Sequence, residues 1–223
     1  MALVEDNHSR VQNAYDYLVA EITAFRIRTG APLSENRIAA QLGISRTPVR
    51  EALQRLEKEG LVRRTENARF TVAQPTTQEA NEALDLLEVL DTYIARRAAE
   101  LMTPEQVDQI RASVDRMVEA AAAGDRDAWS EADIAYHRVV NGIANNALVS
   151  ETVKATRRRV QRFWLHAPSM GSRLEDCSME HRVLADAMIE KRYDDIEPAV
   201  KEHISHMRER ILDLLATTSV LFG

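Results

Sequence analysis

The sequence contains a single cysteine, no long apolar run and no excess of positive charge, and each of these absences excludes a class of protein or of partner. Cys177 has no second cysteine with which to form an internal disulfide, which fits a reducing compartment. No apolar segment is long enough to span a membrane, and the first residues lack the layout of a signal peptide. There are no repeats and no low-complexity tracts beyond four alanines at 120–123. We therefore expect a cytoplasmic protein that does not span a membrane.

The formal net charge of −6 argues at first against a nucleic-acid partner, but the charge is unevenly distributed. Residues 1–75 hold 11 lysines and arginines against 9 acidic residues, whereas residues 76–223 hold 18 against 26. The first part is therefore mildly basic and able to approach phosphates. A length of 223 residues suggests two domains, and the stretch 73–78, with Pro75 and two threonines, is typical of a linker between them.

Two short helices separated by a tight turn are predicted between residues 34 and 59. Ser34 is placed as the N-cap of the first, and Gly43 allows the left-handed turn that ends it. Pro48 fits the first turn of the second helix, where a missing N–H costs nothing, and Gly60 ends that helix. The apolar residues of the second helix repeat at helical spacing and predict a buried stripe, namely Val49, Ala52, Leu53 and Leu56. A helix over 10–27, preceded by an arm at 1–9, is expected to complete this core.

The exposed start of the second helix carries side chains that donate hydrogen bonds to phosphates and base edges. A recognition helix enters the major groove of DNA in this orientation, with its N-terminus first. The alternative interpretation is a solvated helix surface, because many helical hairpins never touch DNA. We predict DNA contacts for Arg37, Ser45, Arg46, Thr47 and Arg50.

The segment 46–53, RTPVREAL, followed by Leu56, Gly60, Leu61 and Val62, resembles the GntR family of bacterial winged-helix transcription regulators. The resemblance covers about residues 8–75 and implies a double-stranded DNA partner with a palindromic operator. It also implies a wing, which we place at 61–64 and 70–72. Relatives commonly carry Arg-Gly at the wing tip, where this chain has Ala68-Arg69, and arginine does not make the same turn cheaply. Arg69 is nevertheless predicted to contact DNA. Phe25 stands where the family usually has a glycine, which we interpret as local repacking.

The remainder of the chain is helical in pattern, so the predicted fold class is mainly α, with an N-terminal winged helix-turn-helix followed by an all-α six-helix bundle. The expected helices are 77–102, 104–123, 126–143, 147–167, 172–191 and 193–218. This arrangement resembles the FadR C-terminal domain (FCD) group of the family, and six helices rather than seven suggest its VanR-like branch. The predicted domains are 1–75 for DNA binding and 76–223 for effector binding and dimerisation.

A second constellation of residues lies in the predicted bundle. Asp133 and His137 are four residues apart, so they share a helix face, while His181 and His203 fall on later helices. One carboxylate and three imidazoles suit a divalent ion such as Zn²⁺, Ni²⁺ or Mn²⁺. From spacing alone, surface or satisfied core histidines remain an alternative. The family resemblance implies that Asp133, His137, His181 and His203 are the ligands, and it assigns no ligand position to His8 or His166; His206 is a competitor on a neighbouring face.

The effector pocket departs from the family pattern. The family often places an arginine near the pocket where this chain has Leu90, and Arg96 or Arg97 lies one or two turns later. A basic run on the fourth expected helix of the bundle consists of Arg157, Arg158, Arg159 and Arg162. These side chains point in every direction around a helix, so some can face the pocket, and we expect most of them to lie on a solvated face. Cys177 is read as a buried structural thiol.

These patterns predict a homodimeric transcription regulator, of the repressor type that is common in the family, which responds to a small organic acid bound at a metal site. Two alternatives stay open. One is a metal-dependent hydrolase fused to a DNA-binding head, although no nucleophile motif and no general base beyond Glu180 are present. The other is a regulator whose metal is structural or whose site is empty.

Overall fold

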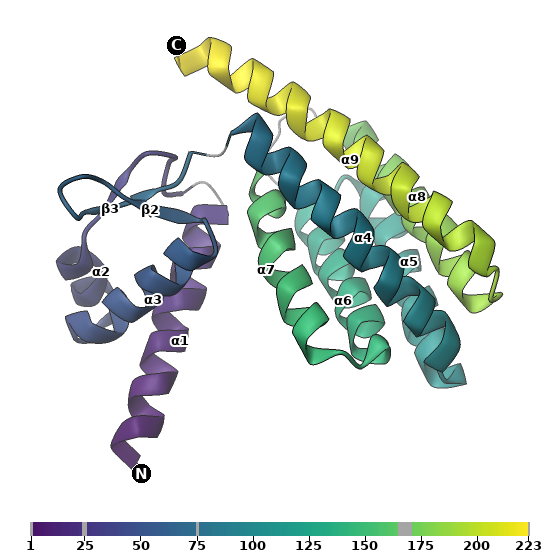
Figure 1. Cartoon of the computed structure of the whole chain (residues 1–223), viewed down its shortest axis with the longest axis horizontal. Helices are drawn as coiled ribbons and strands as arrows, with labels where there is room; N and C mark the ends of the chain where they lie inside the picture. Colours follow the sequence, from purple (N-terminus) through teal and green to yellow (C-terminus); the bar gives the residue numbers. More distant parts are fainter. Residues whose placement is uncertain (1, 24–25, 75, 165–170, 223) are drawn as a thin grey trace. The chain divides into compact units, whose positions relative to one another are not determined.

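The computed structural model describes residues 2–23, 26–74, 76–164 and 171–222, which form two compact units, Met1–Thr76 and Thr77–Gly223 (Figure 1). The predicted fold class is confirmed: a helix-turn-helix with a small sheet is followed by a helical bundle. Among the described residues, no helix is both long and apolar enough to cross a membrane.

The first unit packs three helices against a three-stranded antiparallel sheet. Its elements are α1 (Ala2–Thr23), β1 (Pro32–Leu33), α2 (Glu35–Leu42), α3 (Arg46–Lys58), β2 (Val62–Arg64) and β3 (Phe70–Val72), with strand order β1-β3-β2. Leu33 pairs with Phe70, and Val62 pairs with Val72. The core is formed by the apolar faces of the helices, including Leu18, Leu53 and Leu56, none of which is exposed to solvent.

The predicted caps of the helix-turn-helix are confirmed. The Ser34 hydroxyl accepts a hydrogen bond from the Arg37 amide, and Gly43 ends α2 with a φ of 66°. The Gly43 amide donates to the carbonyls of Ala39 and Ala40, which would otherwise lack partners at the helix end. The turn between α2 and α3 is therefore determined by local sequence.

One expectation for this unit is wrong, and one short strand was not predicted. The segment 1–9 is not an arm, because α1 begins at Ala2; the absence of apolar periodicity there does not prevent a helix from extending beyond the core that it packs on. The turn around Gly30 and Pro32 also contains strand β1, which is too short to show a period of two. Phe25 and Pro75 lie outside the described residues.

The second unit contains six helices within its described part, as predicted: α4 (Thr77–Leu101), α5 (Pro104–Ala123), α6 (Arg126–Ala144), α7 (Ala147–Trp164), α8 (Gly171–Ile189) and α9 (Tyr193–Phe222). A capping box at Thr103 and Gln106 starts α5, and Asp125 caps α6. The core is centred on Trp129, whose indole N–H donates to the Ser178 hydroxyl over 2.9 Å and so joins α6 to α8. In Figure 1, α4 and α9 run side by side across one face of the bundle. The predicted break at 168–171 falls mostly on residues outside the description.

Candidate functional site

The start of α3 presents a polar, basic face to solvent. Pro48 and Val49 are buried against the core, so the helix can turn only one side outwards. All six residues predicted to contact DNA are exposed: Arg37 on α2, Ser45, Arg46, Thr47 and Arg50 at the start of α3, and Arg69 in the wing. This face has the shape and the donors that a major-groove reader requires.

Glu35 holds the two arginines of this face. Its carboxylate accepts two parallel hydrogen bonds from Arg50, from Nε over 2.9 Å and from Nη2 over 2.8 Å, and a longer contact of 3.3 Å from Arg46. The hydrogen bonds from Arg50 lower the pKa of Glu35 in spite of its partial burial. The carboxylate therefore stays ionised at neutral pH and orients both guanidinium groups. The sequence pattern did not indicate this role, although Glu35 is the first residue of α2 and faces the helix turn.

The wing turns differently from expectation. The residue in the left-handed region is Ala68, with a φ of 56°, and not Arg69. The Ala68 amide donates to the Thr65 carbonyl, and the Thr65 amide donates to the Arg69 carbonyl, both over 2.9 Å. Alanine bears the cost of this conformation, roughly 1–2 kcal/mol, and Arg69 keeps ordinary backbone geometry. The expectation that Arg69 must make the costly turn is wrong.

In the second unit, Asp133 and His137 of α6 meet His181 of α8. The Asp133 Oδ1, His137 Nε2 and His181 Nε2 atoms are each 3.3 Å from the other two. These separations are long for hydrogen bonds. They match the spacing of ligands around a tetrahedral ion with bonds of about 2.0–2.1 Å, which is roughly 3.3–3.4 Å. His181 also donates from Nδ1 to the Cys177 carbonyl over 2.8 Å, which directs the lone pair of Nε2 towards Asp133.

The charges of this group suit a cation. Burial raises the pKa of Asp133, but the imidazoles of His137 and His181 outweigh burial and hold the pKa well below its usual value. Burial, helped by the Arg157 guanidinium, lowers the pKa of His137 to about 4. An ionised carboxylate and a neutral imidazole at His137 are the protonation states that metal ligation needs. Burial lowers the pKa of His181, but its interactions with Asp133 and Cys177 outweigh burial and raise that pKa well above its usual value, so His181 has to release a proton when an ion binds. The donor set therefore fits a divalent ion.

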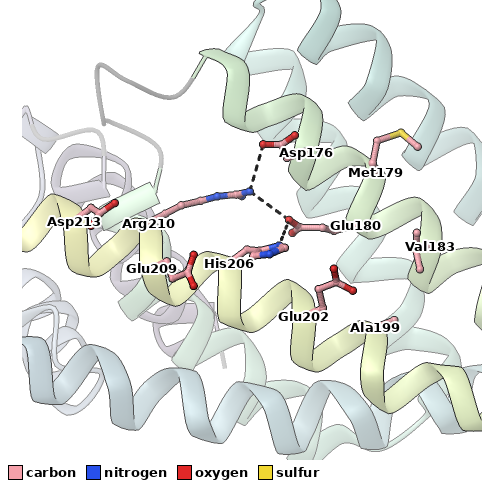
Figure 2. A pocket seen from close by; sticks show the side chains of 10 residues that line it. All are labelled: Asp176, Met179, Glu180, Val183, Ala199, Glu202, His206, Glu209, Arg210 and Asp213. Atoms are coloured by element: carbon pink, nitrogen blue, oxygen red, sulfur yellow. Dashed lines mark hydrogen bonds and ion pairs between the residues drawn. The ribbon is translucent and has the colours of Figure 1, made fainter.

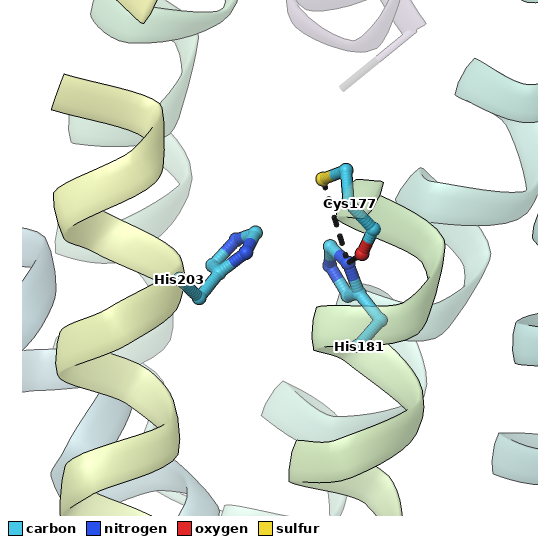
Figure 3. Close-up of side chains that lie close together, drawn as sticks. All are labelled: Cys177, His181 and His203. Carbon is cyan, nitrogen blue, oxygen red and sulfur yellow. Dashed lines mark hydrogen bonds between the residues drawn. The ribbon is translucent and has the colours of Figure 1, made fainter. Parts of the chain in front are cut away.

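The fourth predicted ligand, His203 of α9, lies beside His181, with ring centroids 4.6 Å apart, and lines the same small cavity as His137 and His181. It also falls in a second group of potential donors. His203 Nδ1 donates to the Glu180 carboxylate over 2.7 Å, while its Nε2 is buried and has no hydrogen-bond partner among the described residues. Cys177 completes this group: single donor atoms of Cys177, His181 and His203 all lie within 4.8 Å of one another (Figure 3). The sequence pattern did not indicate Cys177 as a neighbour of the site, although it precedes His181 by four residues on one helix.

Glu180 separates this buried cluster from an open pocket between α8 and α9 with a volume of about 490 Å³ (Figure 2). On the pocket side, its carboxylate contacts His206 Nδ1 at 2.8 Å and Arg210 at 3.3 Å. His206 is half exposed and belongs to this outer pocket, so it does not join the buried donors. His166 lies outside the described residues.

Beside the metal-ligand candidates, Arg157 of α7 pairs with Asp91 of α4 over 2.6 Å, and both side chains are largely buried. Arg157 Nε and the Tyr136 hydroxyl have no hydrogen-bond partner among the described residues. Asp91 lines a cavity of only about 20 Å³ together with His137, His181 and His203, enough for a water or an ion. Among the arginines of the basic run whose side chains the structure describes, Arg157 is the one that pairs with Asp91 beside this cavity.

Two family models match the chain. Residues 10–72 match the model of bacterial regulatory proteins of the gntR family, and residues 82–206 match the model of the FCD domain. Among named relatives, a probable D-xylose utilization operon transcriptional repressor of Paenarthrobacter nicotinovorans is 33% identical over 85% of this chain and 83% of its own length. The transcriptional repressor RspR of Escherichia coli K12 is 24% identical over 95% of this chain and 93% of its own.

Solved structures share the fold. E. coli McbR/YncC superposes with a TM-score of 0.76 at 19% identity, covering 94% of this chain and 98% of that one. A regulator from Rhodococcus sp. RHA1 superposes with a TM-score of 0.75 at 22% identity, covering 92% and 98%. Both relatives matched by sequence are named as transcriptional repressors, which does not favour the hydrolase alternative.

Proposed function

The chain belongs to the GntR family of bacterial transcription regulators and carries an FCD domain, and from this premise we propose that it is a homodimeric repressor controlled by a small organic acid. Each protomer places the N-terminus of α3 in one half-site of a palindromic operator, and the second unit binds the effector and the partner protomer. The six helices in the described part of the second unit support the VanR-like branch of the FCD group. A protein that binds an operator works in the cytoplasm, beside the chromosome.

The observation that carries the DNA-binding proposal is the exposed basic face at the start of α3. Arg46 and Arg50 lie on it, and their guanidinium groups are held in place by hydrogen bonds to Glu35 before DNA arrives. Ordered donors lose less side-chain entropy on binding than mobile ones. Arg37, Ser45 and Thr47 supply further donors, and Arg69 extends the surface to the wing.

Selection of fragmented genomic DNA on the purified protein, followed by sequencing, tests this proposal. We expect a few palindromic sites to be enriched, with half-sites one or more helical turns apart. The control is a protein in which Arg46 and Arg50 are both alanine, and we expect no enrichment with it. Failure of the unaltered protein to enrich any site at low salt, where phosphate contacts are strongest, contradicts the proposal.

For the effector site, we assign Asp133, His137, His181 and His203 as residues that hold a divalent ion. Zn²⁺, Ni²⁺ and Mn²⁺ all suit this donor set. A bound ion supplies positive charge and open coordination positions for a carboxylate. Glu180 orients His203 from behind, and the Cys177 carbonyl orients His181, as outer hydrogen-bond partners do in metal sites.

Arg157 takes the anion-binding role that the family gives to an arginine at the position of Leu90. Arg157 lies close enough to the metal-ligand candidates to lower the pKa of His137, and its guanidinium is paired with the Asp91 carboxylate. A cavity of about 20 Å³ does not admit an organic acid while that pair is closed. The acid therefore binds to an opened form in which Arg157 has left Asp91, and this difference in affinity between forms is what a switch requires.

An apolar surface on α4 and α7 supports the dimer. Leu86, Val89 and Tyr93 follow one face of α4 and are 42%, 67% and 40% exposed. Leu148 on α7 is 79% exposed, and the Asn146 side chain donates to the Tyr93 hydroxyl over 3.1 Å, so the two helices share this surface. Several large apolar side chains exposed on neighbouring helices are typical of an interaction site.

Val89→Glu is expected to convert the dimer to monomers, because the interface buries each new carboxylate without a partner. Operator affinity should fall with the loss of the second half-site. Sedimentation velocity measures the change in mass. Val183→Glu is the matched control, since Val183 is 51% exposed on α8 and lines the pocket between α8 and α9. If the Val89→Glu protein stays dimeric, the dimer interface does not include this surface.

A further inference from the structure

Tyr136 on α6 carries a buried hydroxyl group that has no hydrogen-bond partner among the described residues. The residue is 1% exposed and is one of the largest fully buried side chains of the bundle. Its ring packs edge-on against the imidazoles of His137 and His181, with ring centroids 5.2 and 5.0 Å away. A phenylalanine ring makes the same contacts without burying a polar atom. Core packing therefore explains the ring of Tyr136 but not its hydroxyl.

The surroundings of this hydroxyl limit what can bind to it. Tyr136 and Asp91 line the same cavity of about 20 Å³, together with the three histidines of the candidate metal site. Burial, together with the charge of Asp91, raises the pKa of Tyr136, so the hydroxyl keeps its proton and can donate a hydrogen bond. A space of this volume holds one water-sized group. A partner for the hydroxyl is therefore a small polar group beside the metal-ligand candidates.

Asp91 needs a new hydrogen-bond donor when the site opens. In the structure, Arg157 Nη2 lies 2.6 Å from Asp91 Oδ2, and the two side chains are 15% and 14% exposed. The opened form in the proposed function requires Arg157 to leave Asp91 for the carboxylate of the effector. A largely buried carboxylate that loses its partner is strongly destabilising. An effector that brings a donor of its own to Asp91 offsets this cost.

We propose that Tyr136 and Asp91 select effectors that carry a hydroxyl group on the carbon next to the carboxylate. That hydroxyl donates a hydrogen bond to the Asp91 carboxylate and accepts one from the Tyr136 hydroxyl, so one group of the ligand satisfies both side chains. An acid without the hydroxyl leaves both side chains without a partner, and a site of this kind discriminates strongly against it. This inference rests on the proposed effector site and adds the class of acid, a 2-hydroxy acid.

Calorimetric titration of the full-length protein, loaded with Zn²⁺ and freed of excess metal, tests this selection. The probes are lactate against propionate and malate against succinate, because the members of each pair differ by one hydroxyl. We expect the hydroxy acid of each pair to bind roughly 100-fold more tightly. Tyr136→Phe keeps the ring contacts with His137 and His181, and this ratio should fall about tenfold. Tyr193→Phe is the matched control, since Tyr193 is 36% exposed at the start of α9, and it should keep the ratio.

Thermal unfolding without any acid separates a hydroxyl that binds a ligand from one that stabilises the fold. Tyr136→Phe removes a buried polar atom that has no partner among the described residues. Its melting temperature should therefore be equal to or above that of the unaltered protein. A lower melting temperature shows that the hydroxyl stabilises the protein by itself, for example through a buried water, and overturns the inference.

The titrations separate this inference from the proposed function. Equal affinities within each pair in the unaltered protein overturn the selection and leave an acid effector standing. A preference for the hydroxy acids that persists undiminished in Tyr136→Phe overturns the role of Tyr136. Binding of none of the four acids overturns the acid effector and the selection together. A preference that falls in Tyr136→Phe, with an unchanged or raised melting temperature, supports the inference.

Discussion

His181→Ala is expected to weaken the affinity for divalent metal by roughly 100-fold or more, since even outer-shell changes cost 10–100-fold. His181 belongs to both donor groups, so no arrangement of the remaining side chains restores the set. In the unaltered protein, an ion present at about 1,000 times its dissociation constant stabilises the fold by roughly 4 kcal/mol. For a unit of this size, that corresponds to a rise in melting temperature of about 10 °C. The variant should show almost none of this rise.

Chelator competition measures the affinity, and thermal unfolding with and without Zn²⁺ measures the stabilisation. His206→Ala is the matched control, because His206 contacts Glu180 from the outer pocket and is 42% exposed in its side chain. It should keep the metal affinity within a few-fold. His181→Gln repeats the test with less loss of volume, and retained operator binding shows that the first unit is intact. Equal metal affinity in the His181 variants and the unaltered protein rules out the assignment of His181 as a ligand.

The sequence was sufficient for most of the fold because its signals are local. Ser34, Gly43 and Pro48 determine the helix-turn-helix through hydrogen bonds and backbone angles that involve only their neighbours. Strand β1 was not predicted because it consists of two residues and is defined only by its pairing with β3. The left-handed residue of the wing is determined by how Thr65 closes the turn with Ala68 and Arg69, and this closure has no simple sequence pattern.

The candidate site was predictable only where its residues share a helix. Asp133 and His137 lie four residues apart, and this spacing indicated a common face. Cys177 and His181 have the same spacing, but one cysteine alone gave no reason to connect it with a metal. Arg157 could not be distinguished from its basic neighbours, because the inward side of α7 depends on how α7 packs against α4. The partnership of Glu35 with Arg50 spans 15 residues and requires the folded turn between α2 and α3.

Arg50→Ala is expected to relax operator specificity at one base pair, at a cost of about 1–3 kcal/mol in discrimination if the guanidinium reads a guanine. Competition binding with single-base operator variants measures this. The salt dependence of affinity separates the two kinds of contact, because loss of a phosphate contact lowers the slope by about one, whereas loss of a base contact does not. Arg26→Ala is the control, since Arg26 is exposed on the first unit, pairs with Glu21 and is not among the residues predicted to contact DNA. Unchanged preference among operator variants in Arg50→Ala contradicts a reading role.

Glu35→Gln distinguishes a carboxylate that orients the arginines from one that only balances their charge. The amide cannot accept the paired charge-assisted bonds from Arg50, so the guanidinium groups of Arg46 and Arg50 lose their common anchor. Removal of a negative charge near the phosphates should at the same time raise affinity for random DNA. We therefore expect the ratio of operator to random affinity to fall roughly tenfold, which corresponds to the 1–3 kcal/mol range of a base contact. If both affinities rise equally and the ratio is preserved, Glu35 affects only the charge of this surface, and the two arginines contact the bases without being oriented by Glu35.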